Sequence, residues 1–353
     1  MARLDSYLTE MVNRKGSDLH FMAGDLARIR VHGDLRPMGE TPLPPALVQA
    51  ALLEIMPPKA MERFDRLDGA DFAYALPGYG RFRVNVLRQL NGLGGVFRSI
   101  PSEMLTMEEL GMPPAIHALA RANNGLILIT GKTGSGKSTT LASIIDDINT
   151  RTKGHIITIE DPIEFVHQRK GCLISQREIG LHTPSFAAAL HSALREDPDA
   201  ILVGELRDLE TISIAVTAAE TGILVLGTLH TNGSAQTVDR VINVFPADKQ
   251  QHVRTMLSTS LRGVISQQLL KRADNSGRVA ALEILVNTPA VANLIRQGKL
   301  DQLENTMQSG ISTGMRTMDN SIQGLFDQRV ISGNEAYRAS INKARFENLK
   351  GQD

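Results

Sequence analysis

The stretch that most constrains this chain is the octapeptide at residues 131–138, which reads Gly-Lys-Thr-Gly-Ser-Gly-Lys-Ser. It has the G-x-x-x-x-G-K-[ST] spacing of a phosphate-binding loop. The apolar run at 126–129 before it indicates a buried strand, and residues 139–145 after it indicate the start of a helix. A strand, a glycine-rich loop and a helix in this order direct backbone N–H groups and a helix N-terminus toward an anion. The sequence therefore predicts a nucleotide-binding site.

The residue types in this loop suit that chemistry. Lys137 is predicted to reach the terminal phosphates of a nucleotide, and the hydroxyl of Ser138 is predicted to bind Mg²⁺. A chance glycine-rich turn is the alternative, but a chance match would not bring the correct strand and helix with it. The predicted nucleotide-binding residues are Gly131, Lys132, Thr133, Gly134, Ser135, Gly136, Lys137, Ser138 and Thr139.

Composition narrows the class of protein. The chain has 353 residues, which is enough for two domains that each bury a core. Its 38 basic and 38 acidic residues cancel, so it lacks the basic excess that is typical of nucleic-acid binders. Cys172 is the only cysteine, which excludes an intrachain disulfide and a multi-cysteine metal site and fits a reducing cytoplasm. We expect no signal peptide, and no apolar run approaches the roughly 20 residues of a membrane span.

The first hundred residues predict a small α+β domain without a phosphate loop of its own. Apolar residues at helical spacing from Leu4 to Val12 predict an amphipathic helix, and residues 44–56 predict a second. Strands are predicted at 28–32, 71–75, 81–86 and 96–100. Residues 101–114 are predicted to be a linker with a short helical piece at 106–110. The predicted domains are therefore 1–100 and 115–353.

Arginines recur on one side of this first domain. Alternation in the predicted strand at 81–86 places three apolar side chains on one face and Arg81, Arg83 and Asn85 on the other. Arg98 lies close by, on the next predicted strand. A solvated strand face accounts for this pattern, and so does a set of arginines directed at a phosphate, because arginine forks match phosphate oxygens.

Three predicted strands of the second domain end in polar side chains. The run at 155–159 is followed by Glu160 and Asp161, the run at 200–204 by Glu205, and the run at 223–229 by His230. Ligands of open α/β sheets bind at the carboxyl ends of the strands. Glu160 is predicted to hold an attacking water, with a plain acidic turn before a proline as the alternative. Glu205 is predicted to hold the Mg²⁺ shell, and His230 to sense the γ-phosphate, with a structural histidine as the alternative.

The rest of the second domain alternates strand and helix patterns, which predicts a mostly parallel, RecA-like sheet. Residues 265–270 and 278–285 flank a turn at 274–277 and predict a late hairpin. From Thr288 onward, helical patterns dominate and glycines separate them.

Four motifs occur in the order found in a known family. They are the loop at 131–139, the acidic segment at 158–164, the strand and carboxylate at 201–208, and the segment at 227–231 that contains His230. In that family they correspond to the Walker A motif, the aspartate box, the Walker B motif and the histidine box. With these motifs and the opening segment at 14–20, the chain resembles the type IV pilus retraction ATPases (PilT-like proteins) of the type II and type IV secretion ATPase superfamily, over nearly its whole length.

The resemblance implies a PAS-like N-terminal domain, a linker and a RecA-like ATPase domain with C-terminal helices. It implies that Arg81, Arg83 and Arg98 correspond to nucleotide-facing arginines of the family, and that Glu160, Glu205 and His230 are catalytic. It also implies a homo-hexamer that hydrolyses ATP with Mg²⁺ and works at the cytoplasmic face of the inner membrane. The implied partners are an inner-membrane pilus platform protein and a paralogous pilus ATPase, and no nucleic acid is among them.

Other functions stay open. The segment at 290–297 reads Ala-Val-Ala-Asn-Leu-Ile-Arg-Gln where retraction members carry A-I-R-N-L-I-R-E, so an accessory retraction paralogue fits as well. A pilus-extension or secretion ATPase of the same superfamily usually has an additional N-terminal domain and often a four-cysteine insert, which the single cysteine does not favour. A RecA-like DNA motor needs cationic loops or aromatic stacking platforms, and this chain has no Trp, only four Tyr and no net charge.

Overall fold

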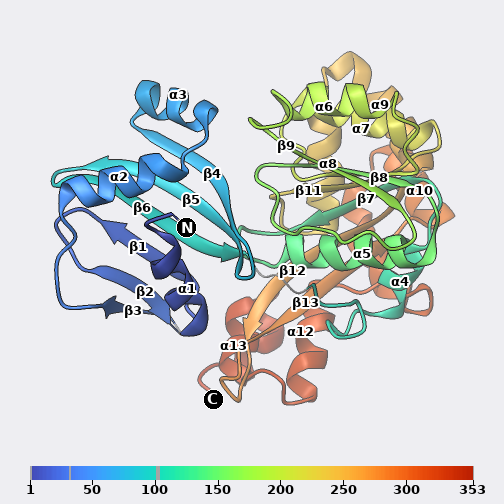
Figure 1. Ribbon diagram of the computed structural model, residues 1–353. Helices are drawn as coiled ribbons and strands as arrows, with labels where there is room; N and C mark the ends of the chain where they lie inside the picture. Colours follow the sequence, from blue (N-terminus) through green and yellow to red (C-terminus); the bar gives the residue numbers. More distant parts are fainter. Residues whose placement is uncertain (1, 32, 101–103, 353) are drawn as a thin grey trace. The chain divides into compact units, whose positions relative to one another are not determined.

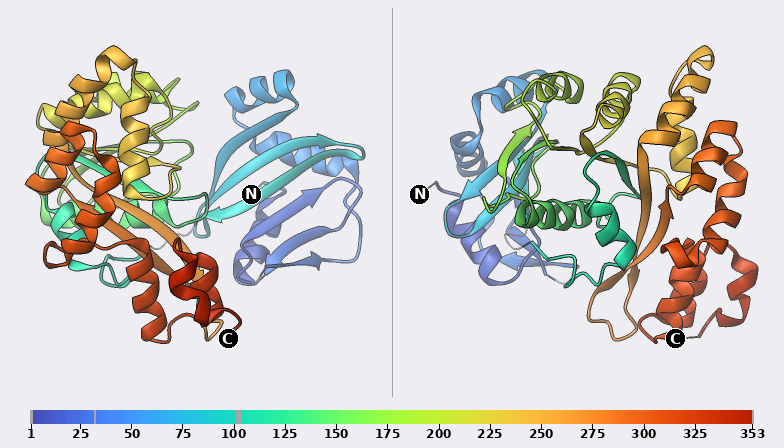
Figure 2. Two further views of the ribbon diagram at one scale, coloured as in Figure 1. Left: turned by 180° about the vertical axis from the view of Figure 1, so that it is seen from behind. Right: turned by 90° about the vertical axis from the view of Figure 1, so that its right-hand side faces the viewer.

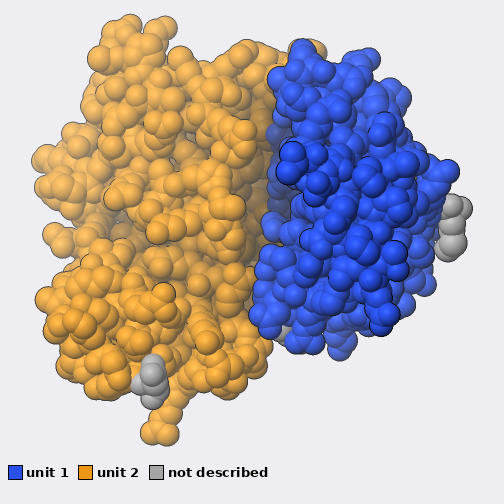
Figure 3. All heavy atoms as spheres, turned by 90° about the vertical axis from the view of Figure 1, so that its left-hand side faces the viewer, with its two compact units in different colours: residues 1–104, 161–166, 178–182 blue, residues 105–160, 167–177, 183–353 orange. Residues whose placement is uncertain are grey.

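The computed structural model describes residues 2–31, 33–100 and 104–352. It divides into two compact units, which Figure 3 colours separately. Unit 1 comprises the described part of Met1–Met104 together with two later segments, Asp161–Val166 and Glu178–His182, and unit 2 comprises the remaining described residues. His32, at the end of a predicted strand, and residues 101–103, at the start of the predicted linker, lie outside the described residues.

Unit 1 is built on a six-stranded sheet in the order β3-β2-β1-β6-β5-β4, in which neighbouring strands run antiparallel. The elements predicted for this region are confirmed, with ends that differ by a few residues at most. The strands are β1 (Asp18–Met22), β2 (Ala27–Val31), β3 (Asp34–Met38), β4 (Gly69–Leu76), β5 (Gly80–Gln89) and β6 (Gly92–Ile100), and the helices are α1 (Asp5–Asn13), α2 (Pro45–Ile55) and α3 (Pro58–Leu67).

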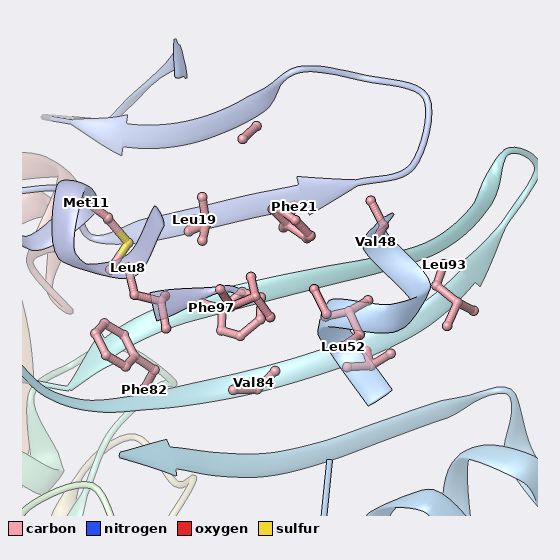
Figure 4. Packing of buried hydrophobic residues seen from close by; sticks show 14 of the residues in the cluster. Leu8, Met11, Leu19, Phe21, Val48, Leu52, Phe82, Val84, Leu93 and Phe97 are labelled. Atoms are coloured by element: carbon pink, nitrogen blue, oxygen red, sulfur yellow. The ribbon is translucent and has the colours of Figure 1, made fainter. Parts of the chain in front are cut away.

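The core of unit 1 lies between the sheet and the helices α1 and α2, as Figure 4 shows. Strand β5 alternates as predicted, because Phe82 and Val84 are buried whereas Arg83 is exposed. Each large apolar side chain that is fully buried contributes about 1.5–3 kcal/mol. A shift of one residue in register would turn this apolar set outward, so the packing also fixes the arginines on the opposite face of the sheet.

Unit 2 contains a seven-stranded sheet in the order β13-β12-β7-β11-β10-β8-β9, with helices against both faces (Figures 1 and 2). The strands are β7 (Gly125–Thr130), β8 (His155–Glu160), β9 (Leu173–Glu178), β10 (Ala200–Val203), β11 (Leu224–Leu229), β12 (Leu261–Lys271) and β13 (Arg278–Val286). The helices are α4 (Pro114–Ala120), α5 (Lys137–Arg151), α6 (Phe186–Ala193), α7 (Leu209–Glu220), α8 (Ser234–Asn243), α9 (Ala247–Ser260), α10 (Pro289–Gln297), α11 (Leu303–Ser309), α12 (Met318–Asp327) and α13 (Gly333–Ala339), with short 3-10 turns η1 (Leu300–Gln302), η2 (Ile311–Thr313) and η3 (Lys343–Leu349).

The middle of this sheet is parallel, as predicted. Strands β12, β7, β11, β10 and β8 pair in parallel, and β7, β10 and β11 are buried along their whole length. Their side chains are apolar on both faces because helices cover both faces. The predicted late hairpin is confirmed, since β13 pairs antiparallel with β12. The carboxyl ends of the parallel strands therefore lie at one edge of the sheet, which is where ligands of such sheets bind.

The short helical piece predicted at 106–110 is no more than a single turn. Residues 106–110 form a hydrogen-bonded turn, in which the Leu110 N–H donates to the carbonyl of Thr106 at 3.0 Å. The Thr106 hydroxyl accepts from the Glu109 N–H, and the Glu109 carboxylate accepts from the Thr106 N–H. These two bonds form a capping box, which starts a helical turn, and Gly111 with φ of +62° ends the segment after that single turn.

Across the three described stretches of the chain, no helix combines the length and the apolar character that crossing a membrane requires.

Candidate active site

The phosphate loop lies between β7 and α5, as the sequence predicts. Gly131 and Gly136 have positive φ angles of +141° and +89°. A Cβ on Gly131 would lie 2.3 Å from the carbonyl oxygen of Gln267, and a Cβ on Gly136 would lie 2.7 Å from the Nε2 atom of the same residue. Both the backbone conformation and the close approach of β12 therefore require glycine at these two positions.

The polar atoms of the loop suit an anionic ligand. The Lys137 ammonium donates to the carbonyls of Gly131 at 2.8 Å and Lys132 at 3.2 Å, so it lies across the mouth of the loop. The hydroxyl oxygen of Ser135 is buried and has no hydrogen-bond partner among the described residues. A buried hydroxyl without a partner costs stability, and a phosphate oxygen in the loop would supply the missing partner. The loop thus fits the phosphates of a nucleotide.

The structure brings the predicted strand-end residues to one edge of the sheet. Val203 at the end of β10 pairs with Ile159 of β8 on one side and with Gly227 of β11 on the other. Glu160 and Glu205 therefore leave neighbouring strands at similar heights. The carboxylate of Glu160 accepts a hydrogen bond from the Thr158 hydroxyl at 2.6 Å and one from the Gln176 amide at 3.4 Å.

Glu205 forms a compact charged cluster with two neighbours. Its carboxylate lies 2.6 Å from Nη2 of Arg207 and 3.3 Å from Nε2 of His230, and its side chain is 19% exposed. Burial tends to raise the pKa of Glu205, but the hydrogen bond and charge of Arg207, together with His230, hold that pKa below its ordinary value. Glu205 is therefore ionised at neutral pH, as a ligand for the Mg²⁺ shell has to be.

Arg207 and Gln267 are two residues whose importance the sequence did not make clear. Arg207 stands beside the Walker B carboxylate in the segment at 201–208, which made it only a weaker candidate for the site. Gln267 gave none, because the contacts that bring it to the loop depend on the pairing of β12 with β7, whose residues are more than 120 positions earlier in the chain.

The predicted arginines lie on unit 1. Arg83 in β5 and Arg98 in β6 are directly paired across the two strands, so they lie side by side on the same face of the sheet. Nε of Arg98 donates to the carboxylate of Asp18 at 2.8 Å. Burial tends to raise the pKa of Asp18, but hydrogen bonds from Ser17 and Arg98 hold it below its ordinary value. Arg81 lies 3.6 Å from the carboxylate of Glu178, within the same unit. That these arginines face a nucleotide stays a prediction.

The predicted metal ligands are Ser138 at the start of α5 and Glu205. Apart from residues 1, 32, 101–103 and 353, which the structure does not describe, no three His, Cys, Asp or Glu side chains gather in a way that would hold a metal ion by themselves. This agrees with the chemistry of Mg²⁺, which usually takes only one or two protein ligands together with substrate phosphates.

Comparison with known proteins gives matches along nearly the whole chain. The family model described as Type II/IV secretion system protein matches residues 1–338. The type IV pilus retractation ATPase PilT of Pseudomonas aeruginosa is 52% identical over 320 residues, which cover 91% of this chain and 93% of that protein. The type IV pilus ATPase PilU of the same organism is 41% identical over 332 residues, which cover 94% of this chain and 87% of that protein.

Solved structures agree with these matches. A crystal structure of the pilus retraction motor PilT with bound ADP superposes with a TM-score of 0.92 at 41% identity, over 99% of this chain and 100% of that chain. The ATPase DotB of Legionella pneumophila gives a TM-score of 0.80 at 30% identity, over 94% of each chain. The predicted fold class and the predicted resemblance to PilT-like secretion ATPases are confirmed. The chain belongs to the type II/IV secretion system protein family.

Proposed function

We propose that this chain is an ATP-hydrolysing motor that drives type IV pilus retraction, the disassembly of pilin that underlies twitching motility. The observation that carries the proposal is the glycine-constrained phosphate loop beside the Glu205, Arg207 and His230 cluster at one sheet edge. The relatives named as pilus retraction ATPases support the biological role, since they match this chain over most of its length.

The residues of the site divide the chemistry as follows. Lys137 and the loop N–H groups hold and neutralise the phosphates. Ser138 and Glu205 would hold Mg²⁺, which supplies positive charge that stabilises the transferring phosphoryl group. Glu160 orients the attacking water and accepts its proton, while His230, in contact with Glu205, reports on the terminal phosphate. The reverse assignment of the two glutamates is the alternative.

The motor would act as a homo-hexameric ring at the cytoplasmic face of the inner membrane, against a platform protein of the pilus machine. Arg81, Arg83 and Arg98 would contact the nucleotide either within one chain or across the interface between two chains. A paralogous pilus ATPase is a further partner. The 41% identity to PilU favours one second candidate function, that of an accessory retraction motor.

A deletion strain tests the proposal and separates it from its alternatives. Cells that lack this chain are expected to extend pili but not to retract them, and wild-type protein, but not the Lys137→Ala variant, is expected to restore retraction. Cells without any pili would identify an extension motor. Normal retraction in the deletion strain, with a loss only under load, would identify an accessory motor.

A further inference from the structure

A buried glutamine from β12, the strand beside β7, lies directly against the phosphate loop. Gln267 is in β12 and is only 3% exposed. Its Oε1 atom accepts a hydrogen bond of 2.7 Å from the hydroxyl of Thr140, a buried residue in the first turns of α5. Buried polar side chains of this kind are costly unless they are paired, so the bond fixes the carboxamide and the helix relative to each other.

The same residue contacts the loop at two other points. Its backbone carbonyl is the nearest atom to the site that a Cβ on Gly131 would occupy, at 2.3 Å, and its Nε2 atom is the nearest to the corresponding site on Gly136, at 2.7 Å. Gln267 thus contacts the first glycine of the loop, the last one, and the helix that follows.

The position of Gln267 in the strand explains this reach. Ser266 pairs with Thr130, the last residue of β7, so Gln267 is the first residue of β12 beyond the paired stretch. At that point β7 turns into the loop while β12 continues straight alongside it. The neighbouring Gln268 pairs with Ala281 in β13 and points to the opposite face of the sheet.

We propose that Gln267 is a positioning residue for the phosphate loop, and that it sets the orientation of the loop N–H groups and of the α5 N-terminus through Thr140, Gly131 and Gly136. This inference rests on the proposed ATPase function. A phosphate gains most from N–H donors that already point at it, because no binding energy is then spent on ordering the loop. Loss of the carboxamide would therefore weaken nucleotide binding more than it weakens the fold.

The test compares four variants of the full chain with the wild type. Gln267→Leu keeps the volume but removes the hydrogen bond, and Gln268→Leu makes the same change on the opposite face of β12. Thr140→Val removes the other partner, and the double variant Thr140→Val with Gln267→Leu replaces the buried polar pair by an apolar one. The measurements are the thermal unfolding temperature without nucleotide, the KM and kcat for MgATP, and the equilibrium affinity for a fluorescent ADP analogue.

We expect Gln267→Leu to raise the KM for MgATP and to weaken ADP binding by about fivefold or more, as the loss of one net hydrogen bond implies. Gln268→Leu is expected to leave both constants within twofold of the wild type, roughly the spread of surface substitutions. In the double variant, stability is expected to recover, because no buried polar atom is left without a partner, whereas nucleotide affinity stays low.

Two results would overturn the inference. If Gln267→Leu and Gln268→Leu bind nucleotide equally well, the glutamine does not position the loop. If nucleotide affinity recovers together with stability in the double variant, Gln267 only fills space. An inactive wild-type protein would instead refute the proposed ATPase function, so the two failures are distinct.

Discussion

Replacement of Gly131 by alanine tests whether the close approach of β12 shapes the phosphate loop. The new Cβ would lie 2.3 Å from the carbonyl oxygen of Gln267 and 2.6 Å from the hydroxyl oxygen of Ser135, and the residue has a φ of +141°. A strained backbone conformation costs about 1–3 kcal/mol, and overpacking costs about 1–3 kcal/mol more. We therefore expect Gly131→Ala to lower the free energy of unfolding by about 2–6 kcal/mol, a large part of the roughly 5–15 kcal/mol of a typical domain.

Gly134 provides the matched control within the same loop. Its φ is +79°, but a Cβ there would meet no atom within 4 Å. Only the conformational cost of about 1–2 kcal/mol applies to Gly134→Ala. Urea unfolding of the nucleotide-free proteins, followed by circular dichroism, measures both changes. If the two variants are equally stable and have the same KM for MgATP, the contact between Gly131 and β12 does not constrain the loop, and the steric reasoning is wrong.

The remaining predictions concern the chemistry of the site. Lys137→Ala is expected to abolish hydrolysis while circular dichroism shows an intact fold, because the ammonium donates to the loop carbonyls of Gly131 and Lys132 and its side chain is not part of the apolar core; wild-type turnover would refute its role. Glu205→Gln is expected to change the Mg²⁺ dependence of hydrolysis more than Glu160→Gln does, and identical Mg²⁺ titrations would contradict that division. The pKa of Glu205 lies below its ordinary value, so ionised Glu205 contributes its full stabilisation above the pKa that it has in the unfolded chain, and the protein loses this stabilisation as the pH falls through the lower pKa of the folded state. The free energy of unfolding of Glu205→Gln, measured against pH, should lack this loss at acid pH. Arg83→Ala and Arg98→Ala are each expected to reduce kcat at least about tenfold, a cautious value below the 10³–10⁵ of arginine fingers, and unchanged kcat values would return both residues to a solvated sheet face.

Local sequence patterns were sufficient for much of this fold. The phosphate loop was predictable because all residues of its motif lie within one short segment, and the strand and the helix that flank it are adjacent to it in the chain. Glu160, Glu205 and His230 were predictable because each directly follows an apolar run, and parallel strands bring their carboxyl ends together. Strand β5 was predictable from its alternation, since burial of one face leaves a period of two.

The features that the sequence did not predict depend on contacts between distant segments. The bond from Thr140 to Gln267 joins residues that are 127 positions apart, and nothing local marks either partner. Segments 161–166 and 178–182 group with unit 1 although they follow the phosphate loop in the chain. The helical piece predicted at 106–110 is only one turn because Gly111, with φ of +62°, ends it directly after its capping box.

The hairpin of β12 and β13 also holds the segment that follows His230. The Ser266 hydroxyl accepts from the N–H of Gly233 at 3.0 Å, and the buried carboxylate of Glu283 accepts from the N–H of Ser234 at 2.6 Å and from the N–H of Met318 at 3.3 Å. Glu283 thus bonds to the backbone N–H groups of the first residues of α8 and α12, two donors that have no partner within their own helices. Removing either donor would leave a buried carboxylate short of partners, which is costly, so the two helix ends are constrained to move together with the hairpin. Gln267 lies on the same hairpin and accepts from Thr140 in the first turn of α5, so the hairpin bonds to the N-terminal turns of three helices, α5, α8 and α12.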